Sequence, residues 1–467
     1  MKSIKSKLIE FKSKVISPIN FLLGAFLILS FQKTNAQNAL ENYLNEGLKN
    51  NIVVQEKNIT LDKAIYGLKD AQRLFLPAVN FNASYTSGEG GRTIPLPIGD
   101  LLNPVYSTLN QLTHSSSFPQ VSNQNIGFFP VNFYDAKVRT TAQIYNSDLK
   151  NYLDIEHQVV HLREFEILAY KRELIKDLKT AYFNYLMAIT GAQIYQNAIL
   201  LVNRNIEVNK SLLSNGKGLP ASVLRAESEY ERIKNQLLDA QNNIMNAQHY
   251  FNFLLNKKQD DPIDTVYDKK AALLEIEKYI NQANINAREE LKMASLDQGI
   301  NTSIRRLDQQ FWLPKVSAFL DLGSQASDFA FNSQSRYVLV GAQIDIPIFN
   351  WGRNNYKINQ ANDDLRIAGL NAQLITNQLQ LSADMAKNYL ATAYSSYQAS
   401  LKELTSAQSY FKLIESGVKE GINSQIEFID ARNQLTNSQI SVNINLFKVL
   451  QAMASVERET ATYHIQK

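Results

Sequence analysis

The chain has 467 residues, of which 20% are charged and 10% aromatic, a composition that excludes an intrinsically disordered protein. It contains no cysteine, which excludes disulfides, thiolate metal sites, a cysteine nucleophile and a lipid-anchored N-terminal cysteine. The formal net charge is +4, but residues 1–36 carry six lysines and one glutamate, which contribute +5 and leave about −1 for the rest. Nucleic-acid binding by a basic surface is therefore excluded.

Residues 1–36 have the pattern of a signal peptide. A lysine-rich start precedes the apolar run Phe21–Phe31, and Thr34-Asn35-Ala36 offers a small residue for cleavage before Gln37. The alternative is a single membrane anchor, but the apolar run is short for a spanning helix. No later run of 18 apolar residues occurs. If the mature protein enters a membrane, we expect it to do so as β-strands.

Four segments alternate between apolar and polar residues with the period of a β-strand. Residues 77–86 show this pattern, 126–133 give a weaker partner, and a second pair lies within 314–349. The strands are long enough for a tilted transmembrane β-strand, although a soluble sheet with one buried face is the alternative. The predicted hairpins are thus 77–133 and 314–349.

Four strands cannot close a barrel, because transmembrane barrels have about eight strands or more. Open sheet edges are not tolerated in lipid, so several chains must pool their strands if the sheet lies in a membrane. The first hairpin has a long loop, 87–125, rich in glycine and proline, whereas its counterpart 323–336 is short. Long loops of such barrels lie outside the cell.

Long helical stretches follow each hairpin. We expect helices at about 134–215 and 353–419, returning helices half as long at 220–256 and 424–465, and lead-in helices at 39–75 and 275–312. The returning helices carry apolar residues in alternating steps of four and three, a heptad pattern that favours left-handed supercoiling of paired helices. An ordinary helical-bundle core is the alternative.

The two halves of the chain resemble one another. Phe75–Val79 returns as Trp312–Val316, and landmarks near two turns repeat at a spacing of 205, among them Gly216 with Gly421 and Ala226 with Ala431. The pattern predicts two structural repeats, 37–270 and 271–467. Each has a lead-in helix, a hairpin, a long helix, a turn near Gly216 or Gly421, and a return helix.

These features resemble the TolC-like outer membrane efflux proteins across residues 38–465. The resemblance depends on the duplicated Leu-Pro-x-Val entry to each hairpin, the Gly-x₉-Ala turns, and the exit motif of Pro347, Ile348, Phe349, Gly352 and Arg353. It implies an α+β membrane protein. Each protomer of a trimer gives four strands to a shared outer-membrane β-barrel, continuous with a periplasmic α-helical coiled-coil barrel.

The resemblance also implies the function. Members act as the passive exit duct of a tripartite efflux or type I secretion system, without catalysis or cofactor, between outer-membrane lipid and the periplasm. Their partners are a periplasmic adaptor and an inner-membrane pump. The alternatives are a periplasmic coiled-coil scaffold or adaptor without a pore, and an outer-membrane enzyme or adhesin acting through loop 87–125.

The resemblance suggests a periplasmic gate at the second turn, where members carry acidic residues six and nine positions after the glycine. Glu427 and Asp430 stand there, and residues three apart share one helix face. The alternative is a solvated helix start that suits acidic residues. Asn423 stands where those members carry a basic residue, so the sequence leaves open whether the tip closes by the same ion pairs. The expected adaptor contacts are Gly216, Lys217, Gly218, Leu219, Pro220, Gly421, Ile422, Asn423 and Ser424.

One histidine pair has a metal-binding spacing. His157 and His161 lie four apart, flanked by Glu156 and Glu164. We favour a solvated helix face over a metal site.

Overall fold

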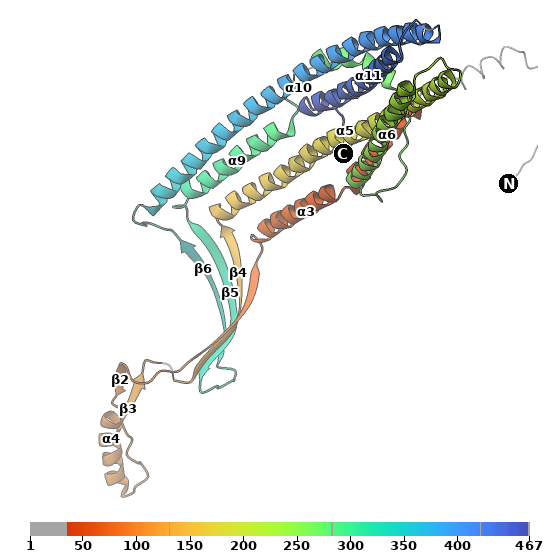
Figure 1. Ribbon diagram of the computed structural model, residues 1–467. Helices are drawn as coiled ribbons and strands as arrows, with labels where there is room; N and C mark the ends of the chain where they lie inside the picture. The colour runs from red at the N-terminus through yellow and green to blue at the C-terminus, as the bar shows by residue number, and fades with distance from the viewer. Residues whose placement is uncertain (1–34, 130, 282–283, 421, 466–467) are drawn as a thin grey trace, which may run out of the picture. The chain divides into compact units, whose positions relative to one another are not determined.

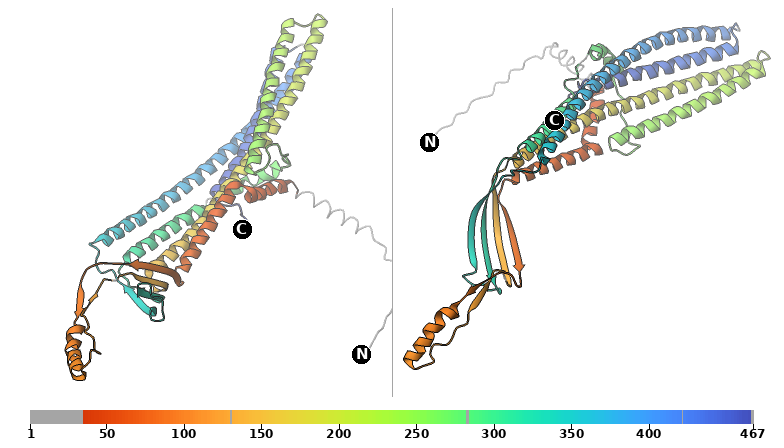
Figure 2. Two further views of the ribbon diagram at one scale, coloured as in Figure 1. Left: turned by 90° about the horizontal axis from the view of Figure 1, so that it is seen from below. Right: turned by 90° about the vertical axis from the view of Figure 1, so that its left-hand side faces the viewer.

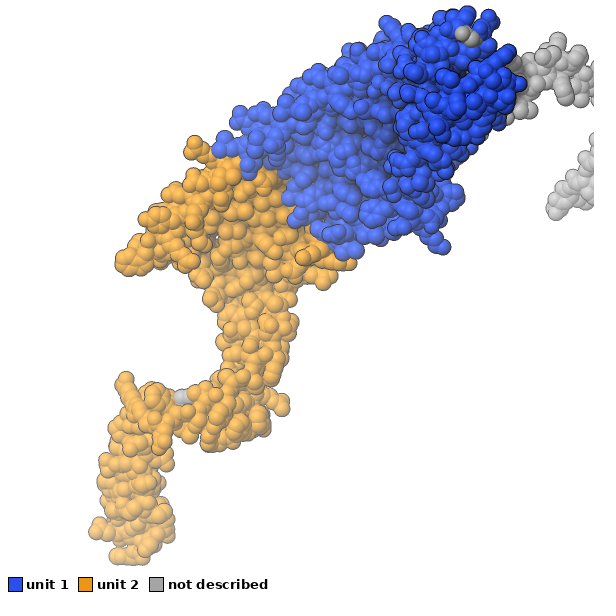
Figure 3. All heavy atoms as spheres, viewed as in Figure 1, with its two compact units in different colours: residues 1–62, 162–295, 370–467 blue, residues 63–161, 296–369 orange. Residues whose placement is uncertain are grey.

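The computed structural model describes residues 35–129, 131–281, 284–420 and 422–465 (Figure 1). The predicted signal peptide lies outside these residues except for its last two positions. The chain divides into two compact units, which Figure 3 colours separately. Unit 1 comprises residues 1–62, 162–295 and 370–467, and unit 2 comprises 63–161 and 296–369. Each unit takes segments from both predicted repeats, so the repeats are interleaved in space.

Unit 2 contains a four-stranded antiparallel sheet (Figure 1). Its strands are β1 (Ala78–Thr86), β4 (Phe133–Tyr145), β5 (Lys315–Ser327) and β6 (Arg336–Asp345), in the order β1-β4-β5-β6. Phe81 pairs with Val138, Val138 with Leu322, and Leu322 with Val338, so one apolar row crosses the whole sheet. Because successive strand residues point to opposite faces, the register gives the sheet one apolar and one polar face.

The prediction that residues 126–133 form the second strand, and that the hairpin ends at 133, is wrong. Residues Gln124–Gly127 form β3, which pairs with β2 (Thr93–Leu96) in a separate two-stranded sheet. The partner of β1 is β4, which begins at Phe133. The predicted helix of about 134–215 included this segment, whose polar positions carry the charged residues Asp135, Lys137 and Arg139. The long helix consequently begins at 147 and not at 134.

The long loop of the first hairpin is not irregular throughout. It contains the helix α4 (Ile98–Thr113), although Pro104 lies in its interior. Two asparagines on α4 bind the backbone of the segment that follows. Asn103 exchanges two hydrogen bonds of 3.0 and 2.8 Å with Val121, and Asn110 does the same with Phe118 at 2.8 and 3.1 Å. These side chains hold a helix that glycine and proline content alone argued against.

Four long helices form two pairs along the chain, and in each pair the second helix follows the first (Figure 2). They are α5 (Ser147–Ser214), α6 (Pro220–Leu254), α10 (Arg353–Lys419) and α11 (Gln425–Glu459). The expected heptad residues of α6 and α11 are all buried or half-buried, including Ile233, Phe251 and Val456. The apolar stripes therefore face other helices, as the spacing predicts.

The lead-in helices are interrupted. The first consists of α2 (Asn35–Asn50) and α3 (Ile52–Arg73), and the second of α7 (Lys269–Leu274), α8 (Ile276–Asn281) and α9 (Glu289–Gln309). Asn51 explains the first break, because its side chain accepts a hydrogen bond of 3.0 Å from the Val53 N–H and donates one of 3.1 Å to the Leu254 carbonyl. It thereby caps α3 and ties it to the end of α6.

The main core of unit 1 lies where α5, α6 and α11 meet the short helices. Leu178, Tyr182, Phe251 and Phe447 are completely enclosed there. Among the described residues, α5 is the one helix long and apolar enough to cross a membrane by length and composition. Leu178 and Tyr182 of this helix pack into the core.

Candidate functional site at the hairpin tips and on the sheet

The turn between α5 and α6 reverses the chain at a left-handed glycine. Gly216 has a φ of 69°, a conformation that favours glycine. The backbone N–H groups of Gly216 and Lys217 donate to carbonyls of the preceding helical turn at 3.0 and 2.9 Å, which closes the end of α5. Pro220 begins α6, where its missing N–H costs no helical hydrogen bond. The predicted contact residues Gly218 and Leu219 therefore lie in a tight turn.

The turn between α10 and α11 is fixed by a capping box. The Ser424 N–H donates to the Glu427 carboxylate at 2.6 Å, and the Glu427 N–H donates to the Ser424 hydroxyl at 3.3 Å. The Asn423 amide donates to the same carboxylate at 3.3 Å. Ile422 is exposed beside it. Gly421 lies outside the described residues.

Glu427 and Asp430 are both exposed near the start of α11. They lie three residues apart, so they share one face of the helix. Hydrogen bonds from Ser424 and Asn423 hold the pKa of Glu427 below its ordinary value of 4.5. Glu427 thus has the local capping role that the sequence left open as the alternative, and its carboxylate is also ionised at neutral pH.

An ion cluster that the sequence reasoning missed joins α6 to α11. Arg432 of α11 is 1% exposed and donates to the Glu229 carboxylate of α6. Arg232 donates to Glu229 at 2.9 Å and to Asn433 at 2.5 Å. Burial lowers the pKa of Arg432 to about 10.

The signal that locates this cluster is a charge inside an apolar stripe. Phe428 and Leu435 are buried on α11, and Arg432 lies between them, four residues after one and three before the other. A buried charge at such a position requires a partner, because an unpaired one is strongly destabilising.

The polar face of the sheet carries a second cluster. Arg139 on β4 donates two hydrogen bonds to Asp321 on β5, at 2.7 and 2.6 Å. Asp135 accepts from Lys137 at 2.7 Å and from the Tyr337 hydroxyl on β6 at 2.7 Å. These residues project to the face opposite the apolar row. The charged face is therefore internally paired, with two cations and two carboxylates.

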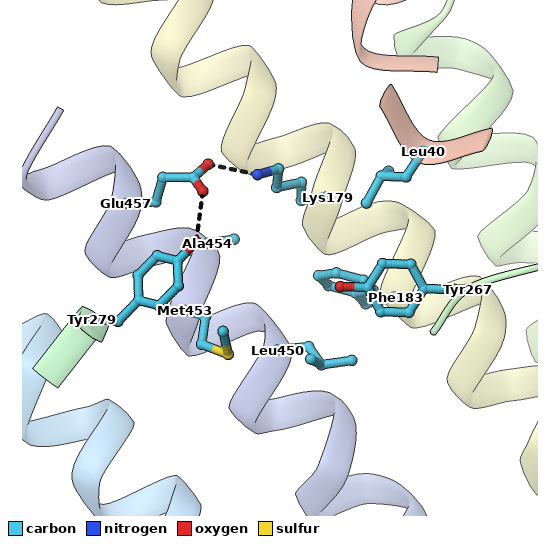
Figure 4. Close-up of a pocket in the computed structure, with 9 residues that line it drawn as sticks. All are labelled: Leu40, Lys179, Phe183, Tyr267, Tyr279, Leu450, Met453, Ala454 and Glu457. Atoms are coloured by element: carbon cyan, nitrogen blue, oxygen red, sulfur yellow. Dashed lines mark hydrogen bonds and ion pairs between the residues drawn. The ribbon is translucent and has the colours of Figure 1, made fainter. Parts of the chain in front are cut away.

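Figure 4 shows a cavity in unit 1 with an ion pair in its wall. Lys179 donates to Glu457 at 2.6 Å, and the Tyr279 hydroxyl donates to the same carboxylate at 3.2 Å. Burial raises the pKa of the Tyr279 phenol above its ordinary value. The cavity measures about 60 Å³, room for a few water molecules. Its charges bind one another, so the arrangement supports a role in anchoring α11 against α5.

The histidine pair on α5 does not form part of a metal cluster. Within the described ranges, no three His, Cys, Asp or Glu side chains are grouped closely enough to hold a metal ion. His157 lies beside Gln158, Ser303 and Arg306 at an open hollow of about 490 Å³ on unit 2.

Comparison with known proteins shows what the chain is similar to. Residues 280–460 match the outer membrane efflux protein family. The chain is 20% identical to the outer membrane protein TolC of Escherichia coli over 474 residues, covering 96% of this chain and 87% of TolC. It is 22% identical to toxin and drug export protein A of Aggregatibacter actinomycetemcomitans over 310 residues, spanning 65% of that relative's length and 64% of this chain.

Solved structures share the fold. The outer membrane protein VceC from Vibrio cholerae aligns with a TM-score of 0.70 at 14% identity, covering 90% of this chain and 95% of VceC. CusC, a transmembrane channel, aligns with a TM-score of 0.73 at 15% identity, covering 91% and 92% of the two chains. The family match over residues 280–460 and these likenesses show that the chain is similar to the TolC-like outer membrane efflux proteins and shares the fold of the solved channels.

Proposed function

We propose that this chain is the outer-membrane exit duct of a tripartite efflux or type I secretion system. It passively conducts substrates that an inner-membrane pump and a periplasmic adaptor deliver, and it uses neither catalysis nor a cofactor. The observation that carries the proposal is the four-stranded sheet, which has one apolar face, one charged face and two outer edges. A sheet of this kind is complete only when other copies extend it.

The strand count supports an oligomer. In the described residues, β1 and β6 each pair on one side only. An open edge in lipid leaves backbone N–H and C=O groups unsatisfied, at a cost of several kcal/mol for each group by order of magnitude. Three copies bring twelve strands, an even number within the range of outer-membrane barrels, and leave no edge. A homotrimer is therefore the assembly that we propose.

The two faces of the sheet assign the inside and outside of the barrel. Val79, Phe81, Val338 and Val340 lie on the apolar face and are exposed in the single chain. They suit contact with outer-membrane lipid. Arg139 and its paired neighbours lie on the other face, which suits a water-filled lumen.

We assign the gate to Glu427 and Asp430. Around a threefold axis, these residues form two rings with six carboxylates in total. Such rings favour cations and repel one another unless a partner, a metal ion or protons intervene. The exposure of both side chains and the ionised state of Glu427 support this assignment.

The hairpin tips are the proposed adaptor contacts. Residues 216–220 and 422–424 form the two turns, and Leu219 and Ile422 expose large apolar side chains there. Exposed apolar residues at a helical tip suit a protein partner. Gly421 belongs to the same proposed contact by its position in the sequence.

Single-channel recording tests the proposal. Detergent-extracted protein is inserted into a planar lipid bilayer, and current is compared for the native chain and Glu427→Gln/Asp430→Asn. We expect discrete, cation-selective steps whose selectivity falls in the variant, because the carboxylate rings are removed. Glu231→Gln is the matched control, since Glu231 is an exposed carboxylate on α6 away from the turn.

The outcomes separate the duct from the gate. Steps with unchanged selectivity in the double variant contradict the gate assignment and leave the duct standing. Folded, membrane-derived protein that makes no channels contradicts the duct, and it favours the alternative of a periplasmic coiled-coil scaffold without a pore.

A further inference from the structure

The segment 93–127, between β1 and β4, forms a small folded unit that carries almost no charge. We call this segment the excursion. Its 35 residues include a single carboxylate, Asp100, and neither lysine nor arginine. Side-chain hydrogen bonds nonetheless hold its fold together. The Asp100 carboxylate accepts from the Asn123 amide at 3.0 Å, and Asn103 and Asn110 bind the returning chain as described above. One face of α4 is thereby covered by the excursion's own backbone.

The opposite face of α4 is apolar and uncovered. Leu101, Val105 and Leu112 are 70%, 53% and 74% exposed. At 3.6 residues per turn these three positions fall within a narrow stripe along the helix. A stripe of this kind on a surface almost without charge marks an interaction site.

We infer that the Leu101/Val105/Leu112 stripe is a contact surface between neighbouring copies of this chain at the outer end of the duct. The inference rests on the proposed function, because the trimer supplies the partner. The excursion follows β1, an edge strand of the sheet, after the short connection 87–92. The copies are related by the threefold axis of the proposed barrel, so like stripes meet one another where the excursions turn toward that axis.

Charge and proximity favour a neighbouring copy of this chain as the partner of the stripe. Copies of a nearly uncharged surface meet without like-charge repulsion. Tethering to one barrel raises the effective concentration of neighbouring excursions to roughly the millimolar range. The helix is already folded and held, so little ordering entropy opposes the contact.

Membrane lipid suits the stripe less well than a second copy of the chain does. Segments that bind membrane surfaces use Lys or Arg for anionic head groups and Trp or Tyr at the interface. The excursion has no Lys, Arg or Trp. Tyr106, its one tyrosine, packs against Phe118 with ring centroids 5.9 Å apart.

The absence of native cysteine makes the test clean. Leu101→Cys, Val105→Cys and Leu112→Cys are made singly in the full chain, and the extracted protein is treated with a short bismaleimide. We expect a band at twice the monomer mass for each variant, because two of three copies can be joined at a time. Gln111→Cys is the matched control, since Gln111 is exposed on the same helix but about 100° away from Leu112.

A second variant tests the contact itself. Leu112→Asp in the Leu101→Cys background places like charges against one another, and we expect it to abolish the double-mass band. Native mass measurement of every variant reports the trimer independently. A trimer without cross-links at the stripe, or with equal cross-linking at Gln111→Cys, overturns this inference while the duct stands. The absence of any trimer overturns the proposed function as well.

Discussion

Arg432 on α11 is enclosed against Glu229 on α6, so one buried ion pair joins the two helical hairpins of a protomer. The two hairpins come from different repeats of the sequence. Glu229 and Arg432 are 203 residues apart in the chain. Asn423, at the position where related proteins carry a basic residue, does not supply such a link. We therefore interpret the Arg432–Glu229 pair as what holds the hairpins together near their tips.

Removing the carboxylate alone is expected to loosen this contact. Glu229→Gln leaves a buried guanidinium without its counter-charge, which costs roughly 3 kcal/mol. Hydrogen–deuterium exchange of the first turns of α6 and α11 should then rise by up to about a hundredfold, because 1.4 kcal/mol is a factor of ten. Glu229→Leu/Arg432→Met is expected to restore most of the protection, since an apolar pair of similar volume replaces the ions. Equal exchange in the native chain and Glu229→Gln would contradict the role of the pair.

The capping box makes a separate prediction at the same tip. Ser424→Ala removes the hydroxyl that accepts from the Glu427 N–H, and loss of an N-cap costs about 1 kcal/mol. Exchange in the first turn of α11 should increase about fivefold. Ser424→Thr is the control that retains a hydroxyl, and it should exchange close to the native rate. Increased exchange in both variants would show that the hydroxyl is not what stabilises the turn.

The hydrogen bonds to Glu427 should make its carboxylate harder to neutralise with acid. The hydrogen bonds that lower the pKa in the folded chain stabilise the ionised form, so their contribution is present above pH 4.5 and is lost as the pH falls through the lowered native value. In the Asp430→Asn variant, Glu427 is the remaining ring carboxylate. Repulsion within the ring raises the pKa of all three copies of Glu427 together, so the test compares variants. We expect cation selectivity, read from reversal potentials, to fall at a lower pH in Asp430→Asn than in Asp430→Asn/Asn423→Ala, which lacks one hydrogen-bond donor to the carboxylate. Equal midpoints in the two variants would contradict the role of that hydrogen bond.

The strands show what local pattern can and cannot predict. β1, β5 and β6 alternate between apolar and polar residues, and the sequence located all three, although Asp321 and Asp345 lie on the polar face of β5 and β6. β4 alternates as well, but Asp135, Lys137 and Arg139 on its polar face resemble the charges of a solvated helix. Only the register with β5 reveals that Arg139 faces Asp321. Local spacing therefore predicted the sheet, while the identity of one strand depended on a partner 182 residues away.

The tips show the same limit. The turn glycines and the acidic start of α11 are local signals, and the sequence predicted their positions. The contact of Arg432 with Glu229 depends on how two hairpins pack, which no spacing within either hairpin contains. Helix α4 was missed for a related reason, because its stability comes from Asn103 and Asn110 binding the returning backbone.

The paired charges of the sheet lead to a last prediction, which depends on the polar face lining the lumen. Asp321 is 1% exposed beneath Arg139, and the two form a bidentate pair, so the native wall contributes little net charge. Asp321→Asn frees one guanidinium per copy, and three copies give a ring of positive charge. We expect the reversal potential to shift toward anions, with the shift reduced at high salt because exposed charges are screened. Arg139→Gln/Asp321→Asn removes both charges and should return the selectivity to the native value. A single variant with native selectivity would indicate that this face does not line the conducting path.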